Sequence, residues 1–129
     1  RLLTRVGDIM RTGAALPVSP VAATLADAIV EMSRKGMGMT AIVDADDHPV
    51  GVFTDGDLRR MFERVQDFTQ VAIRDVMHAQ PRSIGPDRLA VDAVAVMEQH
   101  RINQMLVVDL DGKLVGALHI HDLTQAKVI

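Results

Sequence analysis

A short polar segment, Gly51-Val-Phe-Thr-Asp-Gly-Asp57, combines residue types that could bind an anionic ligand. Gly51 would let a ligand approach the backbone closely, and the hydroxyl of Thr54 could hydrogen-bond a phosphate. Asp57 could accept two hydrogen bonds from the vicinal diol of a ribose. Because a helical pattern follows directly, the free amides at the start of that helix should face the same ligand. The spacing Thr-x-x-Asp is also that of a helix capping box, so spacing alone leaves both interpretations open.

A second segment of the same kind, Gly116-Ala-Leu-His-Ile-His-Asp122, lies 65 residues later. It keeps the glycine and the aspartate, but His119 replaces Thr54 and His121 replaces Gly56. An imidazole could donate a hydrogen bond to a phosphate or carboxylate of a ligand. The two histidines could also be half of a metal site, or simply lie packed or exposed at the start of a helix. Two ligands do not make a metal site, so we predict none.

Arg59 is a further candidate, because it could reach a phosphate from the helix that follows the first segment; the alternative is a solvated, ion-paired helix face. Consecutive helix residues diverge by about 100°, so at most one of Arg59 and Arg60 should face a ligand. The chain has no Ser-His-Asp spacing, no Walker-type glycine loop and no His-Glu-x-x-His. We therefore predict no catalytic residue in these 129 residues.

The elements that must position these segments follow from an internal repeat. A shift of 65 residues aligns Thr24–Leu58 with Leu89–Leu123 without a gap, and ten of the 35 aligned positions are identical. Upstream, Val6-Gly-Asp-Ile-Met10 matches Ile73-Arg-Asp-Val-Met77 at a shift of 67. We divide the chain into a leader at 1–7, a first motif at 8–66, a linker at 67–72 and a second motif at 73–129.

Each copy predicts the order helix, strand, strand, helix. Thr24 is placed to cap a helix whose apolar residues recur at 25, 28, 29 and 32, and which Gly36 ends. The apolar run 39–43 predicts a buried strand, 50–53 a second strand and 55–65 a second helix. In the second copy, strands at 105–108 and 114–118 flank Asp111-Gly112, a hairpin signal. The pattern predicts an α+β fold of two small pseudo-symmetric halves that pack together, with ligands at their junction.

Composition excludes several partners. The chain carries a net charge of −3 with no basic block, and its only aromatic residues are three Phe, so we expect no nucleic-acid partner. No apolar run approaches the ~18 residues of a membrane span. Without cysteine there are no disulfides and no thiolate sites, which is compatible with a reducing cytoplasm.

The duplicated pattern resembles the tandem CBS (cystathionine-beta-synthase) domain pair, through its Asp-Ile-Met and Asp-Val-Met openings and its Gly-x-x-Thr-x-x-Asp corner. The strings GMTAIVD at 38–44, GVFTDGDLRR at 51–60 and LHIHDL at 118–123 are similar to the C-terminal CBS pair of D-arabinose 5-phosphate isomerases. The resemblance implies an upstream sugar isomerase (SIS) domain that carries the activity. A sequence that starts at Arg1 rather than Met agrees with that expectation.

The resemblance also implies ligand contacts. Thr54 and Asp57 would contact the phosphate and ribose of a nucleotide, and Asp122 would do so in the second copy, where His119 departs from the pattern. The base would lie against the extended piece before each first helix, which nominates Leu16, Pro17 and Val18 in the first copy and Arg82, Ser83 and Ile84 in the second.

We predict a regulatory, non-catalytic module of a cytoplasmic isomerase that interconverts D-arabinose 5-phosphate and D-ribulose 5-phosphate. Feedback logic suggests CMP-Kdo as its ligand, because the pathway that the resemblance implies, Kdo and lipopolysaccharide synthesis, ends in this nucleotide sugar. No cofactor is required. The alternatives are an AMP or ATP sensor of another client enzyme, and an oligomerisation module that forms a homodimer, within a tetramer of the parent.

Overall fold

The computed structural model describes residues 3–129, which form two compact units. Pro17–Pro81 make up the first-copy unit, and the described residues up to Leu16 join Arg82–Ile129 in the second-copy unit. The structure is a mixed α+β fold with two small sheets, as the sequence predicts. No helix among the described residues is both long enough and apolar enough to span a bilayer.

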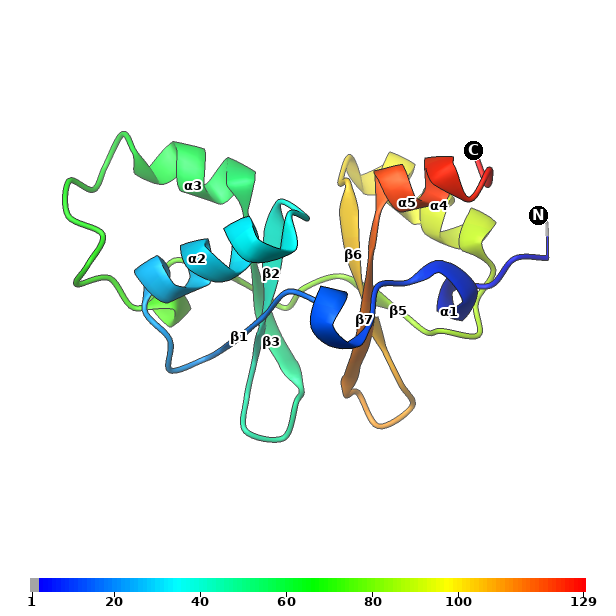
Figure 1. Ribbon diagram of the computed structural model, residues 1–129, viewed down its shortest axis with the longest axis horizontal. Coiled ribbons are helices and arrows are strands. Elements are labelled where there is room, and N and C mark those ends of the chain that lie inside the picture. The colour runs from blue at the N-terminus through cyan, green and yellow to red at the C-terminus, as the bar shows by residue number, and fades with distance from the viewer. Residues whose placement is uncertain (1–2) are drawn as a thin grey trace. The chain divides into compact units, whose positions relative to one another are not determined.

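The first-copy unit is built on a four-stranded sheet in the order β1-β2-β3-β4. Its strands are β1 (Val18–Pro20), β2 (Met39–Val43), β3 (Pro49–Thr54) and β4 (His78–Ala79), and its helices are α2 (Leu25–Lys35), α3 (Asp55–Met61) and a 3-10 turn η2 (Ile73–Asp75). β1 runs parallel to β2, whereas β2, β3 and β4 are antiparallel. Figure 1 shows α2 and α3 on one side of this sheet.

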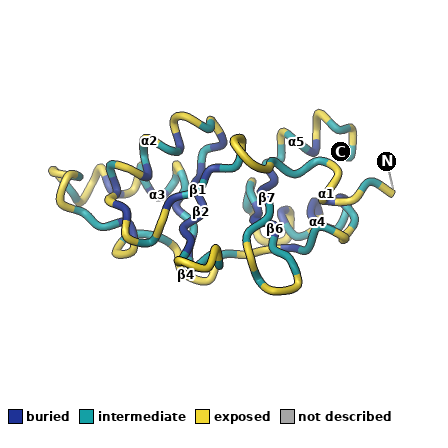
Figure 2. The backbone as a smooth tube through the Cα atoms, turned by 60° about the horizontal axis from the view of Figure 1, so that its bottom comes forward, coloured by how far each residue is buried: buried dark blue, intermediate teal, exposed yellow. Residues whose placement is uncertain are grey.

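The core of this unit lies between α2, α3 and the sheet. Every residue of β2 is buried, as its continuous apolar run predicts, and Phe53 and Leu25 are fully buried. Figure 2 shows β2 as a buried stretch, with exposed backbone elsewhere in the unit. Thr24 caps α2 by accepting a hydrogen bond from the amide of Asp27, and Gly36 ends the helix with φ of 62°, a left-handed conformation that suits glycine.

The second-copy unit repeats this plan with a three-stranded sheet in the order β5-β6-β7. Its elements are α1 (Val6–Ile9), a 3-10 turn η1 (Gly13–Ala15), β5 (Ser83–Ile84), α4 (Ala90–His100), β6 (Gln104–Val108), β7 (Leu114–His119) and α5 (Ile120–Gln125). α4 packs on β6 and α5 on β7. The core includes Val6, Met97, Leu118 and Leu123. A hairpin joins β6 to β7, and Gly112 in its turn has φ of 79°.

The residues that follow each Asp-x-Met opening pair with the second strand of a hairpin. His78 pairs with Val52 in β3, and Arg11 forms an isolated antiparallel bridge with Ala117 in β7. Val52 and Ala117 are equivalent under the 65-residue shift, and Arg11 and His78 under the shift of 67. The second opening, at Ile73–Met77, therefore packs on the first copy, and the first opening, at Val6–Met10, packs on the second copy. For this reason α1 belongs to the second-copy unit.

Some sequence boundaries need correction. The helix predicted at 55–65 ends at Met61, and residues 62–65 continue as hydrogen-bonded turns in which the amides of Arg64 and Val65 both donate to the carbonyl of Met61. The extended piece expected before the first helix, at Leu16, Pro17 and Val18, is a strand that begins only at Val18 and ends at Pro20. Residues 67–72, the expected linker, contact the start of α2 through the carbonyl of Val71 and lie within the first-copy unit. The proposed motif boundaries themselves stay predictions.

Candidate functional site: two strand-to-helix corners

The first corner, Gly51–Asp57, joins β3 to α3 and contains a buried carboxylate. Asp57 has an exposed fraction of 6%. Its Oδ2 accepts hydrogen bonds from the amide of Thr54 at 2.9 Å and from the hydroxyl of Thr54 at 3.0 Å. In return the hydroxyl oxygen of Thr54 accepts from the amide of Asp57 at 3.3 Å. The Thr-x-x-Asp spacing therefore forms a capping box, which is one of its two interpretations.

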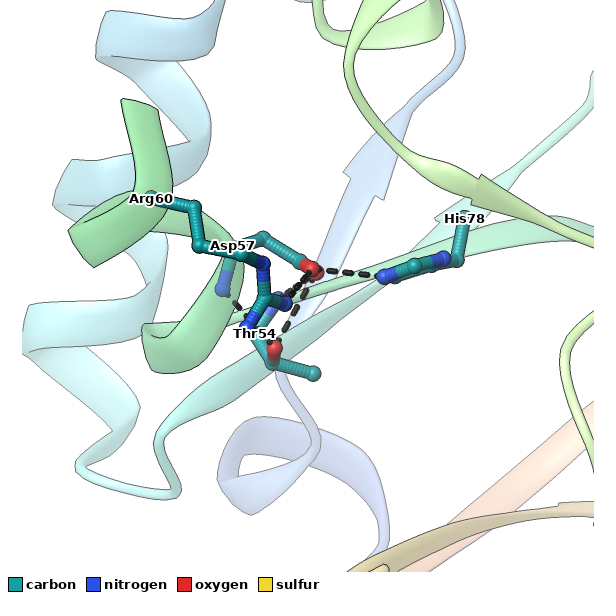
Figure 3. A network of polar contacts seen from close by, with 4 residues as sticks. All are labelled: Thr54, Asp57, Arg60 and His78. Atoms are coloured by element: carbon teal, nitrogen blue, oxygen red, sulfur yellow. Dashed lines mark hydrogen bonds and ion pairs between the residues drawn. The ribbon is translucent and has the colours of Figure 1, made fainter. Parts of the chain in front are cut away.

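The other oxygen of this carboxylate is held by an arginine and a histidine side chain, as Figure 3 shows. Nη2 of Arg60 and Nε2 of His78 each lie 2.6 Å from Oδ1 of Asp57. Both side chains are exposed, at 62% and 65%. The carboxylate thus lies beneath a solvent-accessible rim of hydrogen-bonding side chains, among which Arg60 balances its charge.

Arg59 lies close to the same rim. Beside Gly56, where a side-chain Cβ would be, guanidinium nitrogens of Arg60 lie at 3.4 and 3.6 Å and one of Arg59 at 3.7 Å. Both arginines therefore reach the N-terminal turn of α3. Helix geometry alone predicts that at most one of the two arginines would face this side of α3. Both reach it because their long, flexible side chains can fold back over Gly56.

Gly51 positions this corner through close packing. A Cβ at Gly51 would overlap the side chain of Met77 and would lie 2.9 Å from the carbonyl oxygen of His78. The absence of a side chain at Gly51 therefore lets β4 approach β3 closely enough for His78 to reach Asp57. In this structure the missing side chain of Gly51 thus makes room for β4.

The second corner, Gly116–Asp122, has the same backbone arrangement and different partners. Oδ2 of Asp122 accepts from the amide of His119 at 3.0 Å. Arg11 replaces His78: its Nε lies 3.1 Å from Oδ2 and 3.4 Å from Oδ1, and its Nη2 lies 3.2 Å from Oδ1. Gly116 again allows the approach, because a Cβ there would meet the side chain of Met10 and the carbonyl of Arg11 at 3.0 Å.

His119 takes the place of Thr54 as the cap of the helix. Its Nδ1 accepts a hydrogen bond from the amide of His121 at 3.1 Å, and the two imidazole rings stack with centroids 4.6 Å apart. Burial lowers the pKa of His119, and the nearby His121 lowers it further. A neutral ring is required for this contact, because only a deprotonated Nδ1 can accept.

The residues expected to contact a base lie beside the first strand of each sheet. Pro17 is buried, and its carbonyl accepts from the amide of Ala41, while Leu16 is half-buried. Val18 opens β1, and its amide donates to Oε2 of Glu31 at 2.9 Å. In the second-copy unit Arg82 and Ser83 are exposed and Ile84 is buried. Each set shares a unit with one corner, apart from Leu16, which ends the other unit's segment.

Two of these side chains, Arg11 and His78, were missed as candidates, and Arg60 was considered only as the alternative to Arg59. The signal for Arg11 and His78 is present in the sequence, because each follows the methionine of the repeated Asp-x-Met opening. Their contacts could not be inferred from spacing, since Arg11 and Asp122 are 111 residues apart in the chain. Glu31 was also missed, although it is the residue that holds Val18.

A group of possible metal ligands lies elsewhere, in the turn between β2 and β3. Ligand atoms of Asp44, Asp46 and His48 lie within 4.8 Å of one another. The local turn accounts for this grouping, because Oδ1 of Asp44 accepts the amides of Asp46 and His48 at 2.9 and 3.0 Å. These bonds lower the pKa of Asp44, with the His48 amide as the largest cause.

Comparison with known proteins places this arrangement in a family. Residues 6–64 and 73–128 each match the family model described as "CBS domain". The arabinose 5-phosphate isomerase KdsD of Pseudomonas aeruginosa is 43% identical over all 129 residues, and the chain spans about 40% of that relative's length.

Solved structures share the fold. The CBS-pair protein CBSX2 from Arabidopsis thaliana matches 97% of the chain, and 94% of its own chain, with a TM-score of 0.82 and 23% identity. The CBS domain protein PAE2072 from Pyrobaculum aerophilum, solved in complex with AMP, matches 92% of the chain and 89% of its own, with a TM-score of 0.83 and 24% identity. The repeat, the two sheets and the family match lead to one conclusion: the chain belongs to the CBS domain family and is a tandem CBS pair.

Proposed function

We propose that this CBS pair is a regulatory module that binds a nucleotide or nucleotide sugar at its first strand-to-helix corner. The observation that carries the proposal is the first corner, where a carboxylate with 6% exposure lies beneath a rim of two arginines and a histidine. A carboxylate suits a ribose diol, and a cationic rim suits phosphate or carboxylate groups attached to that ribose.

Binding at this corner is an exchange of partners. Oδ1 of Asp57 now accepts from Arg60 and His78, and a diol that donates to the same oxygen takes over their places. The displaced Arg60 and His78 side chains remain within reach of an anionic group on the ligand, to which both can donate hydrogen bonds. The hydroxyl of Thr54 can turn from Oδ2 of Asp57 to a phosphate oxygen, because a hydroxyl both donates and accepts. Capping and ligand binding are therefore compatible roles of the same pair.

Two solved relatives support a nucleotide as the ligand class. PAE2072 was crystallised in complex with AMP, and CBSX2 was also solved in complex with AMP, with a TM-score of 0.81 to this chain. Their sequence identities of 24% and 23% make this a likeness of fold. It supports an occupant with a ribose and a phosphate, without specifying the base.

We propose CMP-Kdo as the physiological effector, with AMP or ATP as the alternative. The chain is similar to KdsD arabinose 5-phosphate isomerases, which supports the proposal that its parent is an isomerase of this kind. On the further proposal that this parent serves Kdo synthesis, the activated product of that pathway carries a ribose, a phosphate and a sugar carboxylate. Asp57 and Thr54 suit the first two groups, and Arg59 lies on the rim where it can pair with the third. In the second corner, His119 and His121 would offer imidazole donors to the same groups only if the contact of Arg11 with Asp122 were opened.

On this proposal the parent protein is a cytoplasmic arabinose 5-phosphate isomerase, and the CBS pair adjusts its activity in response to the effector. Regulation requires the effector to bind two states of the parent with different affinity, because equal affinity would shift neither. No catalytic role falls to the chain itself.

A thermal-shift titration with CMP-Kdo, AMP and ATP tests the ligand class. A ligand at 100 times its Kd stabilises the folded state by about 2.7 kcal/mol, which is easily measured as a rise in Tm. We expect CMP-Kdo to raise Tm and Asp57→Ala to abolish the rise. Stabilisation by AMP or ATP but not by CMP-Kdo would identify an adenine nucleotide as the effector. No stabilisation by any of the three ligands would contradict the proposed sensing function.

A second candidate, an oligomerisation module, is favoured by two exposed apolar residues on the helices of the first-copy unit. Val30 on α2 is 56% exposed and Phe62, directly after α3, is 65% exposed. Sedimentation velocity over a range of concentrations tests it. Concentration-dependent dimers that Val30→Glu disrupts, together with no nucleotide response, would favour assembly over sensing.

A further inference from the structure

The two corners share a backbone plan, but their carboxylates are held in different ways. Asp57 is held by a histidine and by an arginine of its own helix, each through one contact to Oδ1. Asp122 is held by Arg11, whose guanidinium contacts both carboxylate oxygens. The position equivalent to Arg60 in the second copy is Gln125, so Asp122 has no matching cation from its own helix.

The difference affects how easily a ligand can displace the side chains that hold each carboxylate. An arginine fork on both oxygens is among the strongest pairings that a carboxylate makes, and its charge persists at every physiological pH. Arg11 is also only 26% exposed, so water replaces little of what it would lose. His78 and Arg60 are more than 60% exposed and can return to solvent when a diol arrives.

The capping residues add to the same contrast. Thr54 carries a hydroxyl that can turn toward a ligand. His119 uses Nδ1 to accept the amide of His121, and its ring is stacked on the ring of His121. A ligand at the second corner would therefore have to displace a two-oxygen fork and approach two stacked rings.

We propose that the residue after each Asp-x-Met methionine decides which corner accepts a nucleotide: Arg11 closes the Asp122 corner, and His78 leaves the Asp57 corner open. This inference rests on the proposed nucleotide-binding function and adds to it a stoichiometry and a specificity determinant. Arg11 and His78 occupy equivalent places, since Arg11 pairs with Ala117 and His78 with Val52 at the same point of each hairpin. Exchanging the two residue types should therefore exchange the behaviour of the corners.

Isothermal titration of the 129-residue chain with AMP as probe tests this. The wild type should bind one molecule, and Asp57→Ala should bind none. Adding Arg11→His to Asp57→Ala should restore one binding site, which Asp122→Ala then removes. The reciprocal change, His78→Arg, should weaken AMP binding to the wild-type corner about tenfold or more, because a forked pair replaces a single contact.

Two results would overturn the inference: one molecule still bound by Asp57→Ala, since the second corner would then be open already, or none bound by the Arg11→His, Asp57→Ala chain. Circular dichroism checks that each variant folds. If Arg11→His does not fold, Arg11→Lys replaces it in the titration, because lysine keeps the charge but loses the forked contact. If the wild type binds no AMP, the inference that His78 leaves the Asp57 corner open to this nucleotide is wrong. The proposed function fails only if CMP-Kdo does not bind either.

Discussion

At the scale of single residues, Asp57 connects the two roles of the first corner. Four donors converge on its carboxylate: the amide and hydroxyl of Thr54, one nitrogen of Arg60 and one of His78. The contacts to Thr54 fix the start of α3, and the contacts to Arg60 and His78 lie on the exposed side. The residue is thus structurally satisfied without a ligand, and a ligand must offer donors at least as good.

The capping and binding roles of Thr54 can be separated by comparison with Thr24. Both threonines cap a helix by accepting the amide of an aspartate three residues later. Thr54→Ala and Thr24→Ala should each lower the free energy of unfolding by about 1 kcal/mol, the usual cost of a lost cap. Only Thr54→Ala should also reduce the rise in Tm that CMP-Kdo causes. Equal responses in the two variants would assign Thr54 to capping alone.

His119 should make the second-copy unit sensitive to acid. Its pKa is lowered in the folded state, chiefly by burial, so the unfolded chain binds the proton more readily. Its contribution to stability is complete above the ordinary histidine pKa of about 6.5 and is lost as pH falls from there through the lowered folded pKa. His119→Thr keeps a capping side chain and removes the titrating group.

Urea unfolding followed by circular dichroism at pH 7.5 and pH 5.5 measures this effect. The wild type should lose more stability than His119→Thr over that interval, because all other titrating groups are common to both chains. Equal losses would show that protonation of His119 does not oppose folding.

At the scale of elements, each corner depends on a short segment that approaches a hairpin over a glycine. The two pairs, Met77 with Gly51 and Met10 with Gly116, are equivalent in the repeat. Across each sheet the same row is formed: Val18, Ala41, Val52 and His78 in the first-copy unit, and Ser83, Leu106, Ala117 and Arg11 in the second. The last member of each row is the side chain that reaches the corner carboxylate.

Gly51→Ala should disturb both packing and the corner. The added methyl group would meet the side chain of Met77 and the carbonyl of His78, so β4 must shift, at a cost of about 1–3 kcal/mol. His78 then moves away from Asp57. Gly85→Ala is the matched control, because a Cβ there meets nothing within 4 Å and the residue has no positive φ. Comparable Tm values for the two variants would contradict the packing role of Gly51.

The elements that sequence patterns predict well are those with local signals. The cap at Thr24, the apolar stripe of α2, the glycine at its end and the buried run of β2 all fall within a few residues of one another. β1, β4 and β5 have three residues or fewer, too short for a pattern. α1 carries no signal that it belongs to the second-copy unit, because its partners, the carbonyls of Pro86 and Arg88, are distant in the chain.

The candidate site likewise has some features that local sequence patterns predict and others that they do not. The spacing of Thr54 and Asp57 predicts a cap, and the structure contains it. The choice of partner at Oδ1 of Asp57, and the fork of Arg11 on Asp122, depend on how strands pair, which no local pattern encodes. Repeat alignment identifies Arg11 and His78 as equivalent positions, but only the folded sheets bring them to a carboxylate.

At the scale of the whole chain, the two units are not two consecutive segments. The second-copy unit needs the residues up to Leu16 as well as Arg82–Ile129. Val6 is fully buried in its core, the amide of Val6 donates to the carbonyl of Arg88, and the amide of Ala90 donates to the carbonyl of Thr4. The first-copy unit is continuous, from Pro17 to Pro81.

Deletion of residues 1–16 should therefore weaken one unit selectively. Loss of the buried Val6 alone removes about 1.5–3 kcal/mol, and the Arg11 pairing goes with it. Amide hydrogen exchange in β6 and β7 should accelerate about tenfold or more, while exchange in β2 and β3 should stay close to that of the full chain. Deletion of residues 1–3 is the control. Unchanged exchange in β6 and β7, or equal acceleration in β2 and β3, would contradict the division.

The central claim is that the chain binds a nucleotide-type ligand at the first corner. The most direct test is an amide NMR titration of the 129-residue chain with CMP-Kdo and, in parallel, AMP. The account predicts saturable shifts of the amides from Gly51 to Arg60 and of His78, lost in Asp57→Ala. Saturable shifts that leave these amides unmoved, or no saturable shift with either ligand, would contradict it.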